Sequence, residues 1–136
     1  MKLEDSPTAA NLREAFAREA QAALRYLYFA RRADIEGRGD VASMLRALAE
    51  GENGHAFGHL ELLEDAADPL SGGGDSRSNL ESSVAEAESD AAAYDGYAEA
   101  ARSDRLTDVA DWFDSVADAE RAHAKQLRRV LSGLDG

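Results

Sequence analysis

Apolar residues recur three or four positions apart along four long stretches of this chain, and polar residues fill most positions between them. This is the spacing of one face of an α-helix. No stretch alternates apolar and polar residues as a half-buried strand does. The pattern therefore predicts an all-α protein, with helices over residues 6–35, 40–65, 78–102 and 107–131.

The first two predicted helices carry apolar faces that can be followed residue by residue. In the first helix the face consists of Leu12, Phe16, Ala23, Tyr26 and Ala30. In the second helix we expect inward positions at Val41, Leu45, Leu48, His55 and Leu62. A histidine is therefore expected among the inward side chains.

Helix-start signals support these boundaries. Ser6 followed by Pro7 is a typical cap and first turn. Asp40 is expected to cap the second helix. Ser78 and Glu81 have the spacing of a capping box, which would open the third.

Residues that lie 68 positions apart match along much of the chain, which indicates a duplicated helical hairpin. We predict one domain over residues 1–136, with an internal repeat over 11–63 and 79–131. The stretch 68–79 between the copies is rich in Gly, Ser, Asp and Pro, as connectors are. Its length suits the crossover loop of a four-helix bundle.

Each copy of the repeat contains a Glu-x-x-His pair. Glu52 and His55 form the first pair, and Glu120 and His123 form the second. Residues three apart share a helix face, so each pair offers a carboxylate and an imidazole to one point. Two such points inside a four-helix bundle would make a two-metal site.

Glu19 lies in the apolar face of the first helix, one turn from Phe16 and from Ala23. An unpaired carboxylate in an apolar interior costs several kcal/mol. Metal coordination would compensate for this cost. The alternative is that Glu19 neutralises a buried Arg25.

The third helix offers less regular candidates, because the repeat places Ala87 at the position of Glu19. Asp90 lies about 60° and Glu86 about 100° from that position around the helix. We expect Glu86, Asp90 or both to replace the missing carboxylate, and a one-residue π-bulge would turn Glu86 inward. Glu88 is expected to face solvent.

Three further residues are candidates for the surroundings of the site. His59 has Leu127 as its counterpart in the repeat, so we expect it to be exposed or outside the ligand set. Tyr26 and Tyr94 correspond in the repeat, and their phenols could donate hydrogen bonds to metal-binding carboxylates. The equal alternative is that both are ordinary core aromatics.

The amino-acid composition limits the kinds of metal site that the chain can form. The chain has no cysteine, which excludes disulfides, thiolate ligands and iron–sulfur clusters. Carboxylates and imidazoles must therefore hold any metal, and iron, manganese or zinc would suit these ligands. The net charge of −12 argues against nucleic acid as a partner. With 13 Arg, 2 Lys and an excess of acids, we expect a salt-adapted, halophilic source. The alternative is an ordinary acidic protein.

The sequence contains no apolar run long enough to span a membrane and no signal-peptide core, so we expect a cytoplasmic protein.

At these residues the chain resembles the rubrerythrin family of ferritin-like di-iron proteins. The segment NLREAFAREAQAALRYLYFA is similar to the first helix of the family, and the two Glu-x-x-His helices are similar to its second and fourth. The resemblance implies a ferritin-like four-helix bundle with two metal ions, expected to be iron. It implies that Glu19 bridges, that Glu52 and Glu120 are terminal ligands, that His55 and His123 bind through their rings, and that Tyr26 and Tyr94 support the ligands.

The resemblance is broken in two places. Rubrerythrins usually carry a rubredoxin domain, whereas this sequence has no cysteine and resembles the short members, which need an external electron donor. The third helix of the family places two Glu three apart. Alignment from Tyr94 puts Glu86 and Ser89 there, and alignment from Asn79 puts Ala87 and Asp90 there.

These observations lead to a first hypothesis, a di-iron oxidoreductase that reduces hydrogen peroxide, or that oxidises ferrous iron with oxygen or peroxide. The alternative is a non-enzymatic protein that holds zinc or iron in a degenerate site. A metal-free scaffold is the third. We also expect a homodimer, in which the glycine-rich loop would let helix pairs exchange between protomers.

Overall fold

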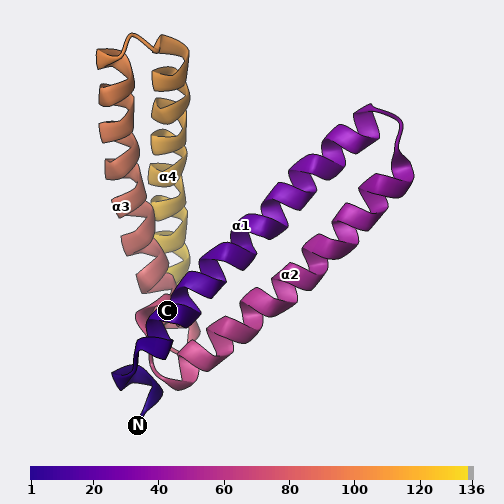
Figure 1. The fold of residues 1–136 in the computed structure, drawn as a ribbon. Helices are drawn as coiled ribbons and strands as arrows, with labels where there is room; N and C mark the ends of the chain where they lie inside the picture. The colour runs from indigo at the N-terminus through magenta and orange to yellow at the C-terminus, as the bar shows by residue number, and fades with distance from the viewer. Residues whose placement is uncertain (135–136) are drawn as a thin grey trace. The chain divides into compact units, whose positions relative to one another are not determined.

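The computed structural model describes residues 1–134, and nearly all of them are helical. Four long helices form two antiparallel hairpins (Figure 1): α1 (Pro7–Ile35) with α2 (Gly39–Asp65), and α3 (Ser76–Ser103) with α4 (Thr107–Gly133). Short 3-10 turns, η1 (Leu3–Asp5) and η2 (Pro69–Ser71), flank the first hairpin. No strand occurs in the described residues. The predicted all-α class and the four helices are confirmed.

The chain divides into two compact units, residues 1–72 and 73–136. The first unit contains α1 and α2 and is called the first hairpin below. The second contains α3 and α4 and is called the second hairpin. In the described part of the chain, no helix combines the length and apolarity that crossing a bilayer requires.

Two of the three predicted helix caps are wrong. Ser6 does cap α1, because its Oγ accepts a hydrogen bond from the Thr8 N–H at 3.2 Å. However, α2 begins at Gly39 after Arg38, whose side chain makes no capping bond, so Asp40 lies inside the first turn. There its negative charge still favours the positive end of the helix dipole.

The cap of helix α3 lies three residues before Ser78, the cap expected from the sequence. Asp75 is the cap, and its Oδ1 accepts a hydrogen bond from the Ser78 N–H at 2.8 Å. This bond from the Ser78 backbone, more than any other interaction, lowers the pKa of the Asp75 carboxyl. Asp is as good a cap as Ser, and Ser76 and Arg77 tolerate helical backbone, so the earlier start gains an extra turn.

The connector between the hairpins is anchored at its beginning. Asp68 is almost fully buried, forms an ion pair with Arg13 of α1, and accepts a hydrogen bond from the Leu70 N–H at 3.0 Å. The hydrogen bond from Leu70 caps the start of η2. The start of the predicted 68–79 loop is therefore tied to α1 rather than free.

Alanine fills the seam between the two helices of each hairpin. Most of the buried alanines of one hairpin lie 68 residues from a buried alanine of the other. These pairs are Ala23/Ala91, Ala30/Ala98, Ala33/Ala101, Ala42/Ala110, Ala49/Ala117 and Ala56/Ala124. Many lie seven residues apart along their helix, which is the repeat of a helix–helix seam. Small side chains allow close helix approach, so most larger apolar residues lie beside the seam. Leu63, fully buried seven residues after Ala56, is the exception among the described residues.

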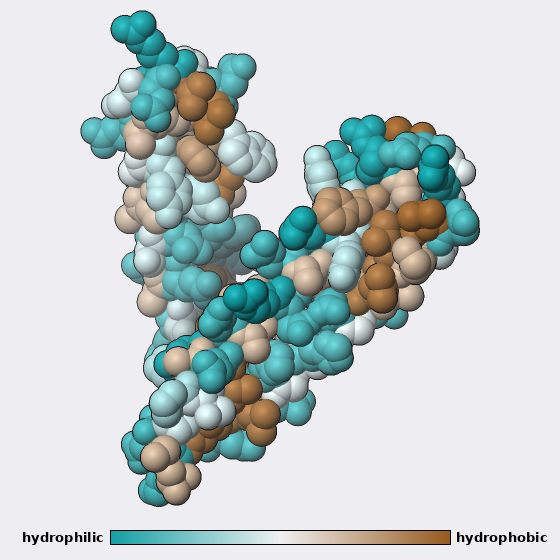
Figure 2. All heavy atoms as spheres, viewed as in Figure 1, coloured by the Kyte–Doolittle hydropathy of each residue, from teal (hydrophilic) through white to brown (hydrophobic). Residues whose placement is uncertain are grey.

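Several residues that were predicted to face inward are therefore exposed. Leu48, His55 and Leu62 all lie on the accessible surface, whereas Val41 and Leu45 are half-buried against the Ala30 and Ala42 cluster. The large apolar residues outside the alanine seam remain accessible. Figure 2 shows such residues in brown within a mostly hydrophilic surface.

Both hairpins make the same turn. In the first, Gly37 has φ 75°, and in the second, Arg105 occupies the equivalent position with φ 63°. Beside each turn an arginine pairs with an aspartate across the two helices. The pairs are Asp34 with Arg46 and Arg102 with Asp114, so the charges are exchanged between the hairpins. The bond to Asp114 is the main reason that the pKa of Arg102 is raised.

Candidate metal centre

Three predicted ligands converge in the first hairpin. Glu19 extends from α1, and Glu52 and His55 extend from α2. The His55 Nδ1 lies 3.5 Å from Glu19 Oε2 and 4.0 Å from Glu52 Oε2. One ligand atom from each residue lies within 4.8 Å of the others. Two helices thus bring two carboxylates and one imidazole to a single point.

One carboxylate oxygen of Glu19 is buried without a hydrogen-bond partner. This oxygen is Oε2, and it accepts no hydrogen bond although His55 Nδ1 is near. Such an oxygen costs free energy unless a cation or a donor compensates for it. Arg25 does not do so, because its guanidinium lies over the Phe29 ring, 5.4 Å from the centroid. The Arg25 alternative is therefore not supported, and the donor set fits a hard or borderline cation.

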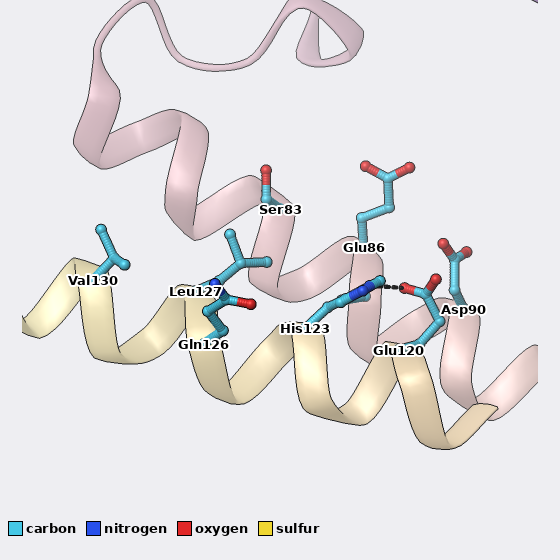
Figure 3. A pocket seen from close by; sticks show the side chains of 9 residues that line it. Ser83, Glu86, Asp90, Glu120, His123, Gln126, Leu127 and Val130 are labelled. Atoms are coloured by element: carbon cyan, nitrogen blue, oxygen red, sulfur yellow. Dashed lines mark ion pairs between the residues drawn. The ribbon is translucent and has the colours of Figure 1, made fainter. Parts of the chain in front are cut away.

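The second hairpin places its predicted ligands around an open groove. Its volume is about 610 Å³, and Glu86, Asp90, Glu120 and His123 lie on its walls. His123 Nδ1 lies 3.7 Å from Glu120 Oε2. Figure 3 shows Glu86 and Asp90 extending from α3, with the Glu86 carboxylate pointing away from Glu120 and His123 of α4.

The third helix reaches this groove without a π-bulge. Helix α3 is α-helical along its whole length, so the proposed bulge is wrong. Glu86 and Asp90 are four residues apart and share one face, which brings both to the groove with Ala87 between them. Glu88 instead forms an ion pair with Arg128 and lines a different groove. The expectation that Glu88 faces solvent is confirmed, because its side chain is about half-exposed.

The possible ligand atoms lie closer together in the first hairpin than in the second. Within residues 1–134, the only group of three metal-binding side chains that meets within 4.8 Å is Glu19, Glu52 and His55. In the second hairpin, Ala87 stands where a carboxylate equivalent to Glu19 would be. The structure thus brings together three of the seven predicted ligands and leaves four around a wider groove.

Tyr94 packs among aromatic side chains, and His59 lies outside the ligand groups. Tyr94 packs edge-on against Tyr97, with ring centroids 5.6 Å apart, and against Phe113 at 5.9 Å. This contact favours the core-aromatic interpretation of Tyr94, and a supporting role for Tyr26 stays a prediction. His59 is half-buried and belongs to no ligand group among the described residues.

Sequence reasoning missed the neutral walls of the groove. These are Ser83, Gln126, Leu127 and Val130. They lie three, four or seven residues from Glu86 or His123, so helical spacing from the predicted ligands would have identified them. They give the groove a mixed polar and apolar lining beside the carboxylates.

Comparisons with known proteins identify the family of this chain. The profile of the rubrerythrin family matches residues 10–73 and 78–136. The rubrerythrin of Clostridium perfringens is 31% identical over 98% of this chain and 74% of its own length. The rubrerythrins of Porphyromonas gingivalis and Nitratidesulfovibrio vulgaris are 32% and 33% identical, over 98% and 92% of this chain and 70% and 69% of their own lengths. The chain belongs to the rubrerythrin family, whose domain is a ferritin-like helical bundle.

Proposed function

We propose that this protein binds two metal ions, most readily iron, and uses them to reduce hydrogen peroxide or to oxidise ferrous iron in defence against oxidative stress. The observation that carries the proposal is the meeting of Glu19, Glu52 and His55 around a buried oxygen that accepts no hydrogen bond. Membership of the rubrerythrin family also supports this proposal, because the family model covers most of the chain and the matching relatives are rubrerythrins.

The side chains have separate roles in this proposal. Glu19, Glu52 and His55 hold one ion, and Glu120 and His123, with Glu86 or Asp90, hold the other. Two ferrous ions would supply the two electrons that, with two protons, convert one peroxide into two waters, and an external donor would return those electrons. The carboxylates favour the more highly charged oxidised state, since negative ligands stabilise positive charge.

The groove of the second hairpin gives a small oxidant access to the donors. It is open to solvent and lies directly beside Glu120 and His123. Ser83 and Gln126 offer neutral hydrogen-bonding groups on its walls, which could bind a peroxide or water without adding charge. The histidines His55 and His123 are more than half-exposed, which is consistent with a site that exchanges small molecules.

The test is peroxide consumption by the iron-loaded chain with a chemical reductant. Glu52→Ala is expected to reduce turnover at least about tenfold, because even residues behind the ligands cost that much in metal sites. Glu61→Ala is the matched control, since Glu61 is an exposed acid of the same helix outside the ligand group. Unchanged turnover in Glu52→Ala, with the helix content intact, would contradict the proposal.

A second candidate is a non-enzymatic metal-binding protein that holds zinc or iron. It is favoured by Ala87 and by the wider spacing of donors in the second hairpin. Metal analysis of the purified native protein, combined with the peroxide assay, distinguishes the two functions. Zinc without turnover would support this candidate, and iron with turnover would support the first.

A further inference from the structure

We infer that the two proposed metal positions, one in each hairpin, load in a fixed order. Glu19, Glu52 and His55 bind the first ion tightly, the second hairpin binds the second ion weakly, and Ala87 sets this difference. The inference rests on the proposed two-metal function and adds to it an order of occupancy. It follows from the separate geometries of the two hairpins.

The first hairpin has a complete set of donors on its own. Glu19, Glu52 and His55 come from α1 and α2 alone, and their ligand atoms already lie within 4.8 Å of one another. Binding there needs little rearrangement of side chains, so little conformational entropy is lost. A cation would also compensate for the buried oxygen of Glu19, which accepts no hydrogen bond. All three features favour tight binding at this position.

The second hairpin lacks the equivalent of Glu19. Glu120 and His123 repeat Glu52 and His55, and their closest N–O distance of 3.7 Å resembles the 4.0 Å of the first pair. The position that should supply the third donor holds Ala87, whose methyl group lines the groove and offers no oxygen. Glu86 and Asp90 flank this position, but no group of three donors gathers there within the described residues. An ion bound there must first draw in one of these carboxylates.

The expected difference in affinity is large. Loss of a residue that merely supports a ligand typically lowers metal affinity about 10–100-fold. The absence of the donor itself should cost no less. The chain is therefore expected to hold a single ion over a broad range of metal concentrations, and to fill both positions only when metal is abundant.

The test is a titration of the metal-stripped, full-length chain with Co²⁺, followed by calorimetry and by visible absorption. We expect one Co²⁺ per chain to bind at least about tenfold more tightly than a second. Glu52→Gln should weaken only the tight step, and Glu120→Gln should weaken only the loose step. Two equal steps in the unmodified chain, or loss of the tight step in Glu120→Gln, would overturn the inference.

The substitution Ala87→Glu tests whether adding the missing carboxylate strengthens metal binding in the second hairpin. It places a carboxylate at the repeat equivalent of Glu19, and it should raise the affinity of the loose step toward that of the tight one. Ala92→Glu is the matched control, because Ala92 is an exposed residue of α3 in the groove that Arg121 and Lys125 also line. It adds the same charge away from the donors and should leave both steps unchanged. A loose step that stays weak in folded Ala87→Glu would contradict the role of Ala87.

These outcomes are independent of the proposed activity. Equal affinities with normal peroxide turnover would reject the loading order and leave the function in place. Ordered loading without turnover at saturating iron would reject the peroxidase and leave the order in place.

Discussion

Gly37 and Arg105 occupy equivalent positions in the two hairpin turns and adopt the same left-handed backbone, with φ values of 75° and 63°. Glycine adopts this conformation freely, whereas a side chain with a Cβ is disfavoured there by roughly 1–2 kcal/mol. The first hairpin therefore has the better residue for its turn, and the second contains local strain.

Replacing Arg105 by glycine should stabilise the protein. We expect Arg105→Gly to raise the free energy of unfolding by about 1 kcal/mol, because the strain at this turn is removed. Gly37→Ala should lower it by about 1 kcal/mol; a Cβ there meets no atom within 4 Å, so the cost would come from the backbone alone. Thermal and urea unfolding of the metal-free protein measure both. A loss of stability in Arg105→Gly would show that the arginine side chain contributes more than the strain costs.

The ion pair between Asp34 and Arg46 should tolerate an exchange of its charges. Asp34→Arg alone places two cations together, and Arg46→Asp alone places two anions together. The double variant should recover most of the loss, because Arg102 and Asp114 already form this pair with opposite polarity in the second hairpin. Both partners are about half-exposed, so each single change should cost at most about 1 kcal/mol. A double-mutant cycle that shows no coupling would contradict this prediction.

Glu19→Gln should have opposite effects on the metal-free and the metal-loaded protein. Without metal, the substitution removes a negative charge from a buried oxygen that accepts no hydrogen bond, so the melting temperature should rise. With metal, it removes a charged ligand, so the stabilisation gained from binding should shrink. Melting curves with and without Zn²⁺ test both effects. If the melting temperature of the metal-free variant falls instead, Glu19 does not destabilise the metal-free protein and the prediction is wrong.

The cap of α3 should make stability depend on pH in the acid range. The hydrogen bond from the Ser78 backbone lowers the pKa of Asp75 in the folded state, so the folded protein favours the ionised carboxyl. Its contribution is complete above about pH 4 and is lost as the pH falls through the folded-state pKa. Asp75→Ala should therefore destabilise the protein at pH 7 and make little difference at the lowest pH at which it still folds. Asp40→Ala provides the contrast, because Asp40 lies inside α2 rather than at its cap. Equal effects of the two substitutions at pH 7 would show that Asp75 does not act as a cap.

The sequence predicts helices better than it predicts which residues pack between them. Helical periodicity and the Ser6 cap locate α1 to within a residue at each end. For α3, Asp75 and Ser78 are both good caps, and only the backbone path before the helix decides between them. Large apolar residues such as Leu48 and Leu62 dominate the pattern, yet the seam consists of alanines and Leu63, because close helix approach is a property of the hairpin as a whole.

The metal ligands are predictable to the extent that their spacing is local. Glu52 with His55 and Glu120 with His123 follow from one helical turn, and the structure shows both pairs. The position of Glu19 beside His55 depends on how α1 and α2 align, which local spacing does not give, but its place in the apolar face of the first helix indicates it as a candidate. Glu86 and Asp90 have no such guide, because Ala87 interrupts the repeat.

The alanine seam has a consequence for register. Because its alanines recur every seven residues, sliding α2 against α1 by one heptad would place alanine against alanine again and would meet little steric resistance. Such a slip would carry Glu52 and His55 about 10 Å away from Glu19. The tight turn at Gly37 and the neighbouring contact between Asp34 and Arg46 oppose this movement, so surface residues far from the ligands hold the ligands in alignment.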